Sequence, residues 1–314
     1  MPSVPIGNIG IYHFRYFAII VITLSVQNSG IQGRQMTKTG VFYHEVLSQY
    51  TWSIIGQKLK NFPQLIKELS SNPNLVIYQI EPVSEELLLK VHTREHLSHV
   101  RHDINYECGI YGAGACVMAA EKVWKGEIRN AFLALSCCHH AHRDYAWGGC
   151  TVSGTGPMIV HMREQFGLRR FAILDTDSHH GDGARELTMG DKDVLHVCFC
   201  STDRVEDDGT KIDVNVGWRT TDSEYLDKVR REFIPRVQKF KPDIVLHVLG
   251  HDTAQGDYGD RGLSWDFFAQ LVEDVKECAD RVCEGRYLVG LGGGSRYEIA
   301  DYITPKIIEI LTKF

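Results

Sequence analysis

Two aspartates and a histidine at alternate positions, Asp175, Asp177 and His179, are well suited to hold a metal ion. Residues spaced by two point to the same side of an extended backbone, so one strand end can present all three. Buried carboxylates are costly unless compensated, and a neighbouring imidazole makes a divalent cation the simplest compensation. Asp252, in the segment GHD, is the candidate for the third protein ligand beside Asp177 and His179. Two carboxylates and one histidine leave positions open for water and substrate, as a catalytic metal requires.

The alternative is that these acids cap a helix beginning near Asp182, which is a common role for a lone aspartate. We favour the metal site because DTDSHH occurs together with GHD in one chain.

Two adjacent histidines, His139 and His140, are candidates for proton transfer. Imidazoles titrate near neutral pH and, beside a metal site, are suited to moving protons. Each needs an orienting acceptor, and Asp175 and Asp182 are the acids not required as metal ligands. One histidine alone would more simply be a surface or core residue, but the tandem at this place favours catalysis.

Three further patterns have structural explanations beside the functional ones. A glycine run lets a backbone approach a ligand closely or turn with positive φ, although a plain tight turn explains it equally well. Histidines at helical spacing do not match the HExxH motif and are better explained as a solvated or packed helix face. Two cysteines at alternate positions of a strand are better explained as core packing. These residues are Gly292, Gly293 and Gly294; His92, His96 and His99; and Cys198 and Cys200.

The elements that position these residues follow from the periodicity of the sequence. From Thr37 onward, short β-branched or apolar runs alternate with longer segments of helical period. This pattern predicts a single α/β domain with a parallel β-sheet flanked by helices on both faces. The predicted strands are 40–44, 75–80, 131–136, 171–175, 194–199, 244–249 and 287–291. The helix-like segments include 114–123, 223–239, 264–282 and 298–313.

Four of the predicted strands are followed by clustered polar or glycine residues. In an open parallel sheet the ligand crevice lies beyond the carboxyl ends of the strands, so the four segments should converge. This placement is the main argument from the residues alone that the protein is an enzyme. The segments are SCCHH from Ser136, DTDSHH from Asp175, GHD from Gly250 and GGG from Gly292.

Composition limits the remaining function classes. The 314 residues are 43% hydrophobic and 24% charged with a net charge of -6, so the basic excess of a nucleic-acid-binding protein is absent. No Pro- or Ser-rich linker divides the chain. Nine cysteines, an odd number without a CxxC pair, favour reduced thiols in a cytoplasmic protein.

The first 35 residues are expected to lie outside the fold. The apolar run 16–26 has eleven residues, too few for a membrane-spanning helix of roughly 20. We favour an upstream extension, with Met36 as the true start and 36–314 as the catalytic domain. A secretory leader is the alternative.

The segments CCHHAHRD, DTDSHHGDG, LGHDTAQGD and LGGG resemble the arginase/deacetylase fold and, within it, the histone deacetylase family. That family includes acetylpolyamine and acetoin-utilisation relatives, and the resemblance extends from about Lys38 to the C-terminus. It implies that Asp177, His179 and Asp252 bind zinc, with ferrous iron as a substitute. It also implies a structural potassium ion near Asp175.

The resemblance also assigns roles to the two histidines. His140, with Asp182 behind it, corresponds to the general base that draws a proton from the attacking water. His139, with Asp175 behind it, corresponds to the partner imidazole. The implied reaction is hydrolysis of an N-acyl amine, such as acetyl-lysine in a peptide or a small acetylpolyamine.

The sequence departs from the family where a tyrosine usually follows the glycine run and donates to the oxyanion. Here Ser295, Arg296 and Tyr297 follow Gly294, so Arg296 aligns with the tyrosine unless the loop is one residue longer and brings Tyr297 there. Many members also carry a pocket phenylalanine where this chain has Gly149. The HPERP-like amino-terminal segment is missing around 44–62. A narrow aromatic tunnel for acetyl-lysine is therefore not implied.

Three functions remain at this stage. The first is a zinc-dependent deacylase acting on a small-molecule or peptide substrate, with no direct contact to nucleic acid or membrane. The second is a catalytically silent relative that binds a metal and an acylated ligand, which the altered tyrosine position would explain. The third is a dimanganese ureohydrolase of the same fold, which the tandem histidines fit less well. The oligomeric state stays open.

Overall fold

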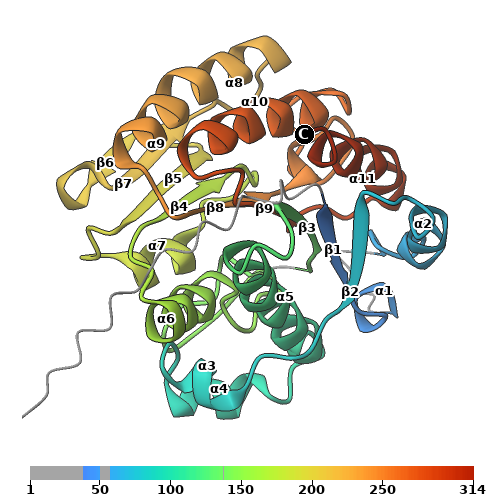
Figure 1. Cartoon of the computed structure of the whole chain (residues 1–314). Coiled ribbons are helices and arrows are strands. Elements are labelled where there is room, and N and C mark those ends of the chain that lie inside the picture. Colours follow the sequence, from blue (N-terminus) through green and yellow to red (C-terminus); the bar gives the residue numbers. More distant parts are fainter. Residues whose placement is uncertain (1–37, 50–56, 137) are drawn as a thin grey trace, which may run out of the picture. The chain divides into compact units, whose positions relative to one another are not determined.

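The computed structural model describes residues 38–49, 57–136 and 138–314, in which one sheet of nine strands is covered by helices (Figure 1). The strand order is β2-β1-β3-β9-β8-β4-β5-β7-β6, and only the pair β6 and β7 is antiparallel. The strands are β1 Thr39–Tyr43, β2 Leu75–Gln79, β3 Asn130–Ala134, β4 Phe171–Asp175, β5 Val194–Cys200, β6 Arg204–Glu206, β7 Lys211–Asn215, β8 Ile244–Leu249 and β9 Tyr287–Leu291.

Helices α8 to α11 lie on one face of the sheet and α5 to α7 on the other, with α3 and α4 beyond them (Figure 1). A π-helical turn, Val229–Phe233, joins α8 and α9, and short 3₁₀ turns occupy Asp207–Gly209 and His251–Thr253. The helices are α1 Val46–Gln49, α2 Phe62–Leu69, α3 Glu85–Leu89, α4 Arg94–Val100, α5 Tyr106–Trp124, α6 Thr155–Phe166, α7 Asp182–Thr188, α8 Asp222–Lys228, α9 Ile234–Phe240, α10 Phe267–Val282 and α11 Tyr297–Leu311.

The predicted fold class is therefore confirmed, and each of the seven predicted strands is found. Two strands at one edge, β6 and β7, were not predicted. The proposed extension 1–35 lies outside the described residues, so that boundary stays a prediction.

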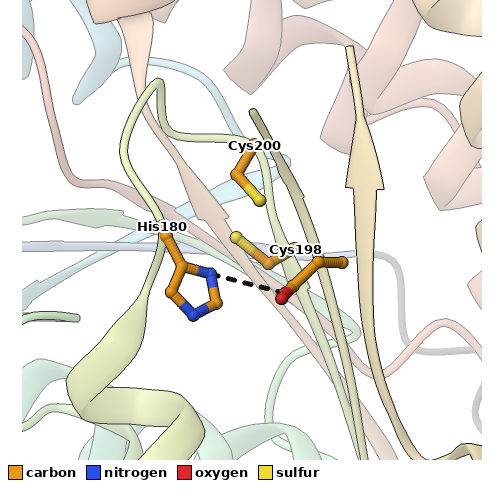
Figure 2. A group of neighbouring side chains, drawn as sticks. His180, Cys198 and Cys200 are labelled. Carbon is orange, nitrogen blue, oxygen red and sulfur yellow. Dashed lines mark ion pairs between the residues drawn. The ribbon is translucent and has the colours of Figure 1, made fainter. Parts of the chain in front are cut away.

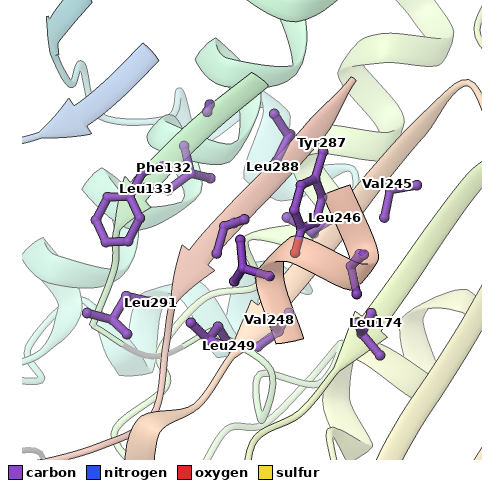
Figure 3. Close-up of a cluster of buried hydrophobic side chains, with 14 of the residues drawn as sticks. Phe132, Leu133, Leu174, Val245, Leu246, Val248, Leu249, Tyr287, Leu288 and Leu291 are labelled. Atoms are coloured by element: carbon purple, nitrogen blue, oxygen red, sulfur yellow. The ribbon is translucent and has the colours of Figure 1, made fainter. Parts of the chain in front are cut away.

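The central strands are buried on both faces, which explains why they read as continuous apolar runs. Every residue of β3, β4, β8 and β9 is buried, and side chains such as Phe132, Leu174 and Leu288 fill the core between sheet and helices (Figure 3). The polar side chain of His247 is accommodated there because its Nδ1 lies 2.6 Å from the Tyr287 hydroxyl. This rigid centre supports the strand ends.

The described cysteines include seven that are free and buried. Cys150 is disulfide-bonded, so the prediction of reduced thiols throughout is wrong for this residue. Within the described ranges, no helix is both long and apolar enough to cross a membrane.

Candidate active site

The polar segments singled out from the sequence lie beyond the carboxyl ends of four strands that are adjacent in the sheet. These strands are β3, β9, β8 and β4, in that spatial order. His139 and His140 follow β3, the DTDSHH segment closes β4, Asp252 follows β8 and the glycine run follows β9. The predicted convergence at one edge is thus observed.

Asp177, His179 and Asp252 form a compact group in which one ligand atom from each residue lies within 4.8 Å of the others. His179 Nδ1 is 3.1 Å from Asp177 Oδ1 and 3.2 Å from Asp252 Oδ2. Both aspartates are 1% exposed or less, whereas His179 reaches the surface of a crevice. The predicted ligand set is therefore brought together with one side open.

The electrostatics of this group fit a bound cation. Burial and the charge of Asp177 raise the pKa of Asp252 to about 6. Hydrogen bonds from His179 to both carboxylates raise the pKa of its imidazole to about 10. A proton on His179 offsets only one of the two carboxylate charges, whereas a divalent cation would offset both, and two carboxylates with one imidazole are a donor set that zinc accepts.

His139 and His140 each contact the carboxylate expected behind them. His139 Nδ1 is 2.9 Å from Asp175 Oδ2, and His140 Nδ1 is 2.7 Å from Asp182 Oδ1. The two rings are 4.0 Å apart between centroids, and both are buried. Asp182 is the first residue of α7 and lies 31% exposed, so this carboxylate is closer to solvent than Asp175.

The surroundings of the two imidazoles shift their pKa values in opposite directions. Burial disfavours the charged ring of His139, but Asp175 and Asp177 outweigh it and raise the pKa to about 9. Burial and the charge of His139 lower the pKa of His140 below its usual value. His140 is therefore neutral at pH 7 and able to accept a proton, while His139 retains one.

Trp147 holds His140 in place from the solvent side. Its indole ring lies 3.7 Å from the His140 ring between centroids, and its Nε1 donates to Asp182 Oδ2 at 2.9 Å. Gly148 has φ +61°, and a Cβ there would lie 2.8 Å from His140 Cδ2. This aromatic contact was not predicted, because nothing in the segment AWGG indicates which ring Trp147 covers.

The glycine run packs against the acidic group. A Cβ on Gly293 would lie 1.9 Å from Asp177 Oδ2, and Gly294 has φ +118° with His251 within 2.3 Å of its Cβ position. A Cβ on Gly292 would meet Val248 at 3.5 Å, an ordinary contact. At Gly293 and Gly294 the backbone thus packs closely against a carboxylate and a histidine, and Gly294 makes a turn with positive φ, while an approach of the run to a ligand stays a prediction.

Neither residue expected to replace the family tyrosine is placed beside the acids. Arg296 is exposed and its guanidinium lies 3.5 Å from Glu298, while the Tyr297 ring lies under the Lys60 ammonium at 3.2 Å. Tyr258 lies beside the acidic group instead, with its ring centroid 5.7 Å from the ring centroid of His179. Its hydroxyl accepts the Gly294 N–H at 3.2 Å, which leaves the hydroxyl proton free to donate.

A buried lysine is a second feature that the sequence did not reveal. Lys58 is 3% exposed, and its ammonium donates to the carbonyls of Ser136 at 2.8 Å and Leu291 at 3.3 Å, at the ends of β3 and β9. Burial lowers its pKa to about 8, although Asp177 and Asp252 oppose the change. It supplies positive charge beneath the acidic group.

The acidic group opens to a crevice of about 460 Å³. Two tryptophans and a tyrosine stand around its mouth, and the described lining residues do not include Arg296 or Tyr297. The lining residues are Trp147, Ser178, His179, His180, Asp182, Cys200, Ser201, Thr202, Trp218, Tyr258, Gly259, Asp260 and Arg261.

Comparison with known proteins agrees with this geometry. Residues 105–311 match the histone deacetylase domain. The chain is 26% identical to a probable deacetylase of Archaeoglobus fulgidus over 88% of this chain and 87% of that protein. It is 27% identical to the histone deacetylase-like amidohydrolase of Pseudomonas aeruginosa, over 74% and 69% of the two chains. The polyamine deacetylase HDAC10 of Danio rerio is 27% identical over 62% of this chain and 31% of that protein. The chain belongs to the histone deacetylase family and is a hydrolase that acts on C–N bonds to remove acyl groups from amines.

Proposed function

We propose that this protein is a zinc-dependent deacylase that hydrolyses the amide of an N-acyl amine, most simply an N-acetyl amine. The observation that carries the proposal is the pairing of His140 with Asp182 beside the group of Asp177, His179 and Asp252. Ferrous iron is the alternative ion, and a structural potassium ion near Asp175 remains a prediction.

Zinc held by these three residues would polarise the amide carbonyl and lower the pKa of the attacking water. His140 takes the proton of that water and passes it to the departing amine, while Asp182 and Trp147 hold its ring in orientation. Asp175 keeps His139 protonated beside the site, where its charge favours a developing anion.

The relatives' names and the open crevice support a small or extended acylated amine as the substrate class. The Danio rerio relative is named for polyamines, and the crevice carries three rings, Trp147, Trp218 and Tyr258, against which a cationic or alkyl amine can pack. Trp218 is 81% exposed, so this rim forms an open surface rather than a narrow tunnel.

Amine release from acetyl-lysine peptides, acetylpolyamines and small acetamides by zinc-loaded protein tests the proposal. Turnover of any of them establishes the deacylase and ranks the substrates. Stoichiometric zinc without turnover of any of them would favour the silent metal-binding relative. Urea release from guanidino substrates by manganese-loaded protein would favour the ureohydrolase.

Tyr258 is the proposed oxyanion donor, so Tyr258→Phe should lower kcat by about 100- to 1,000-fold with little change in bound zinc. The matched variant Tyr297→Phe removes the hydroxyl of the competing candidate and should stay within about twofold of wild type. Steady-state kinetics on the best substrate distinguish them. A larger loss in Tyr297→Phe or in Arg296→Ala than in Tyr258→Phe would reassign the donor.

A further inference from the structure

A second group of potential metal ligands lies next to the candidate active site. It consists of His180, Cys198, Cys200 and Asp213, which each place one ligand atom within 4.8 Å of the others. His180 belongs to the loop after β4, the cysteines to β5 and Asp213 to β7. Figure 2 shows the two sulfur atoms and the His180 imidazole facing a common space.

The sheet itself brings these side chains together. Cys198 and Cys200 are two residues apart on β5 and therefore point to the same face. The parallel pairing of β5 with β7 sets Asp213 directly beside Cys198. His180 then approaches from the adjacent loop, with its Nδ1 3.4 Å from Asp213 Oδ1. Four donors from three segments thus surround one point.

The chemistry of these donors matches a soft divalent cation. Two thiolates, an imidazole and a carboxylate are ligands of tetrahedral zinc, in which ligand atoms stand about 3.8 Å apart when the metal–sulfur bonds are about 2.3 Å. The four ligand atoms lie within 4.8 Å of one another, so a contraction of at most roughly 1 Å would bring them to this spacing. Side-chain rotations of His180 and Asp213 can supply it.

The charges around the group also favour a dication. The group would carry three negative charges as two thiolates and Asp213, and the buried guanidinium of Arg185 pairs with Asp213 and also with the more exposed Glu206 at 3.5 Å. A divalent ion would offset the two thiolate charges that Arg185 does not reach. His180 Nδ1 is meanwhile buried and faces Asp213 Oδ1 at 3.4 Å, on the side where the other donors of the group lie.

An ion can reach this group from solvent, since His180 and Cys200 line the same crevice as His179 and Tyr258. The consecutive residues His179 and His180 contact different groups: His179 contacts Asp177 and Asp252, and His180 contacts Asp213. An ion held by His180 would therefore fix the loop that carries a ligand of the first site.

We propose that His180, Cys198, Cys200 and Asp213 form a second binding site for a soft divalent cation such as zinc. This site does not depend on the proposed deacylase activity. Its alternative is that the two cysteines only fill the core.

Zinc stoichiometry separates these possibilities. Metal-free protein, prepared under reducing conditions, is reloaded with zinc chloride, desalted and measured by plasma emission. Wild type should bind two zinc ions per chain. The double variant C198S/C200S should bind one, and Asp252→Asn should also bind one, held by the site that contains Cys198 and Cys200. A single ion in wild type that the cysteine substitutions leave in place would overturn the proposal.

Cobalt gives a readout that the wild-type protein alone can supply, with the variants as a further comparison. Wild-type protein loaded with Co²⁺ should show sulfur-to-cobalt charge-transfer absorption in the near ultraviolet, because the second group contains two cysteines whereas the group of Asp177, His179 and Asp252 contains none. Asp252→Asn and Cys278→Ser, which changes a free buried cysteine on α10, should keep the band, and C198S/C200S should lose it. Cobalt-loaded wild type without the band contradicts a thiolate site.

Discussion

Asp252→Asn is expected to leave no measurable amine release and to lower the bound zinc by one ion per chain. Asp252 lies in the 3₁₀ turn after β8 and is fully buried. The backbone N–H of Ser178 donates to its Oδ1 at 3.1 Å, and the Ser178 hydroxyl donates to Oδ2. An asparagine keeps the volume and the acceptor for one of these donors, but it removes the charge that a cation requires.

The measurement combines plasma emission with the amine-release assay at saturating substrate. Asp274→Asn is the matched control, since Asp274, on α10, pairs with Arg230 of the π-helical turn and neither residue lines the crevice. It should keep wild-type zinc content and activity. Full activity in Asp252→Asn, at unchanged zinc content, would remove Asp252 from the ligand set.

The strand framework was predictable because buried parallel strands have a local signature. Runs such as FAILD in β4 and IVLHVL in β8 are apolar throughout, as strands covered on both faces must be. Polar residues directly after such runs can only lie at the carboxyl edge of the sheet, so the convergence of His139, Asp177 and Asp252 followed from order along the chain.

The edge strands gave no such signature. β6 reads RVE and is largely exposed, and β7 reads KIDVN. Lys211 in β7 is fully buried because its ammonium donates to the carbonyls of Asp191 and Val194 at 3.0 and 2.7 Å. A lysine in that position argues against a buried strand until its tertiary partners are known, so the sequence alone could not assign it.

Tyr258 and Lys58 were missed for a related reason. Both lie in irregular segments, where neither periodicity nor a motif fixes the direction of a side chain. Tyr258 reaches His179 only because the loop after Asp252 folds back over the acidic group, with Asp257 accepting the backbone N–H groups of Ser295 and Arg296 at 3.0–3.2 Å. Contacts of this kind depend on the path of the whole loop.

His140→Ala is expected to lower kcat by about 100- to 10,000-fold while zinc content stays at the wild-type value, because the variant removes the general base but no metal ligand. His99→Ala, on α4, is the matched control and should behave as wild type. Loss of zinc together with activity in His140→Ala would instead show that the ring is needed to build the metal group.

Asp182→Asn tests the same role through its pH dependence. Asp182 raises the pKa of His140 by a hydrogen bond and by its charge, whereas burial and His139 lower it. Removing the Asp182 charge should therefore lower the pKa of His140 and move the acidic limb of the kcat/KM profile to lower pH. The turnover should also fall, by about 10- to 100-fold, since the ring loses its orienting acceptor. A fall in turnover with an unshifted acidic limb would mean that another group sets that limb, and it would separate the positioning role of Asp182 from proton transfer by His140.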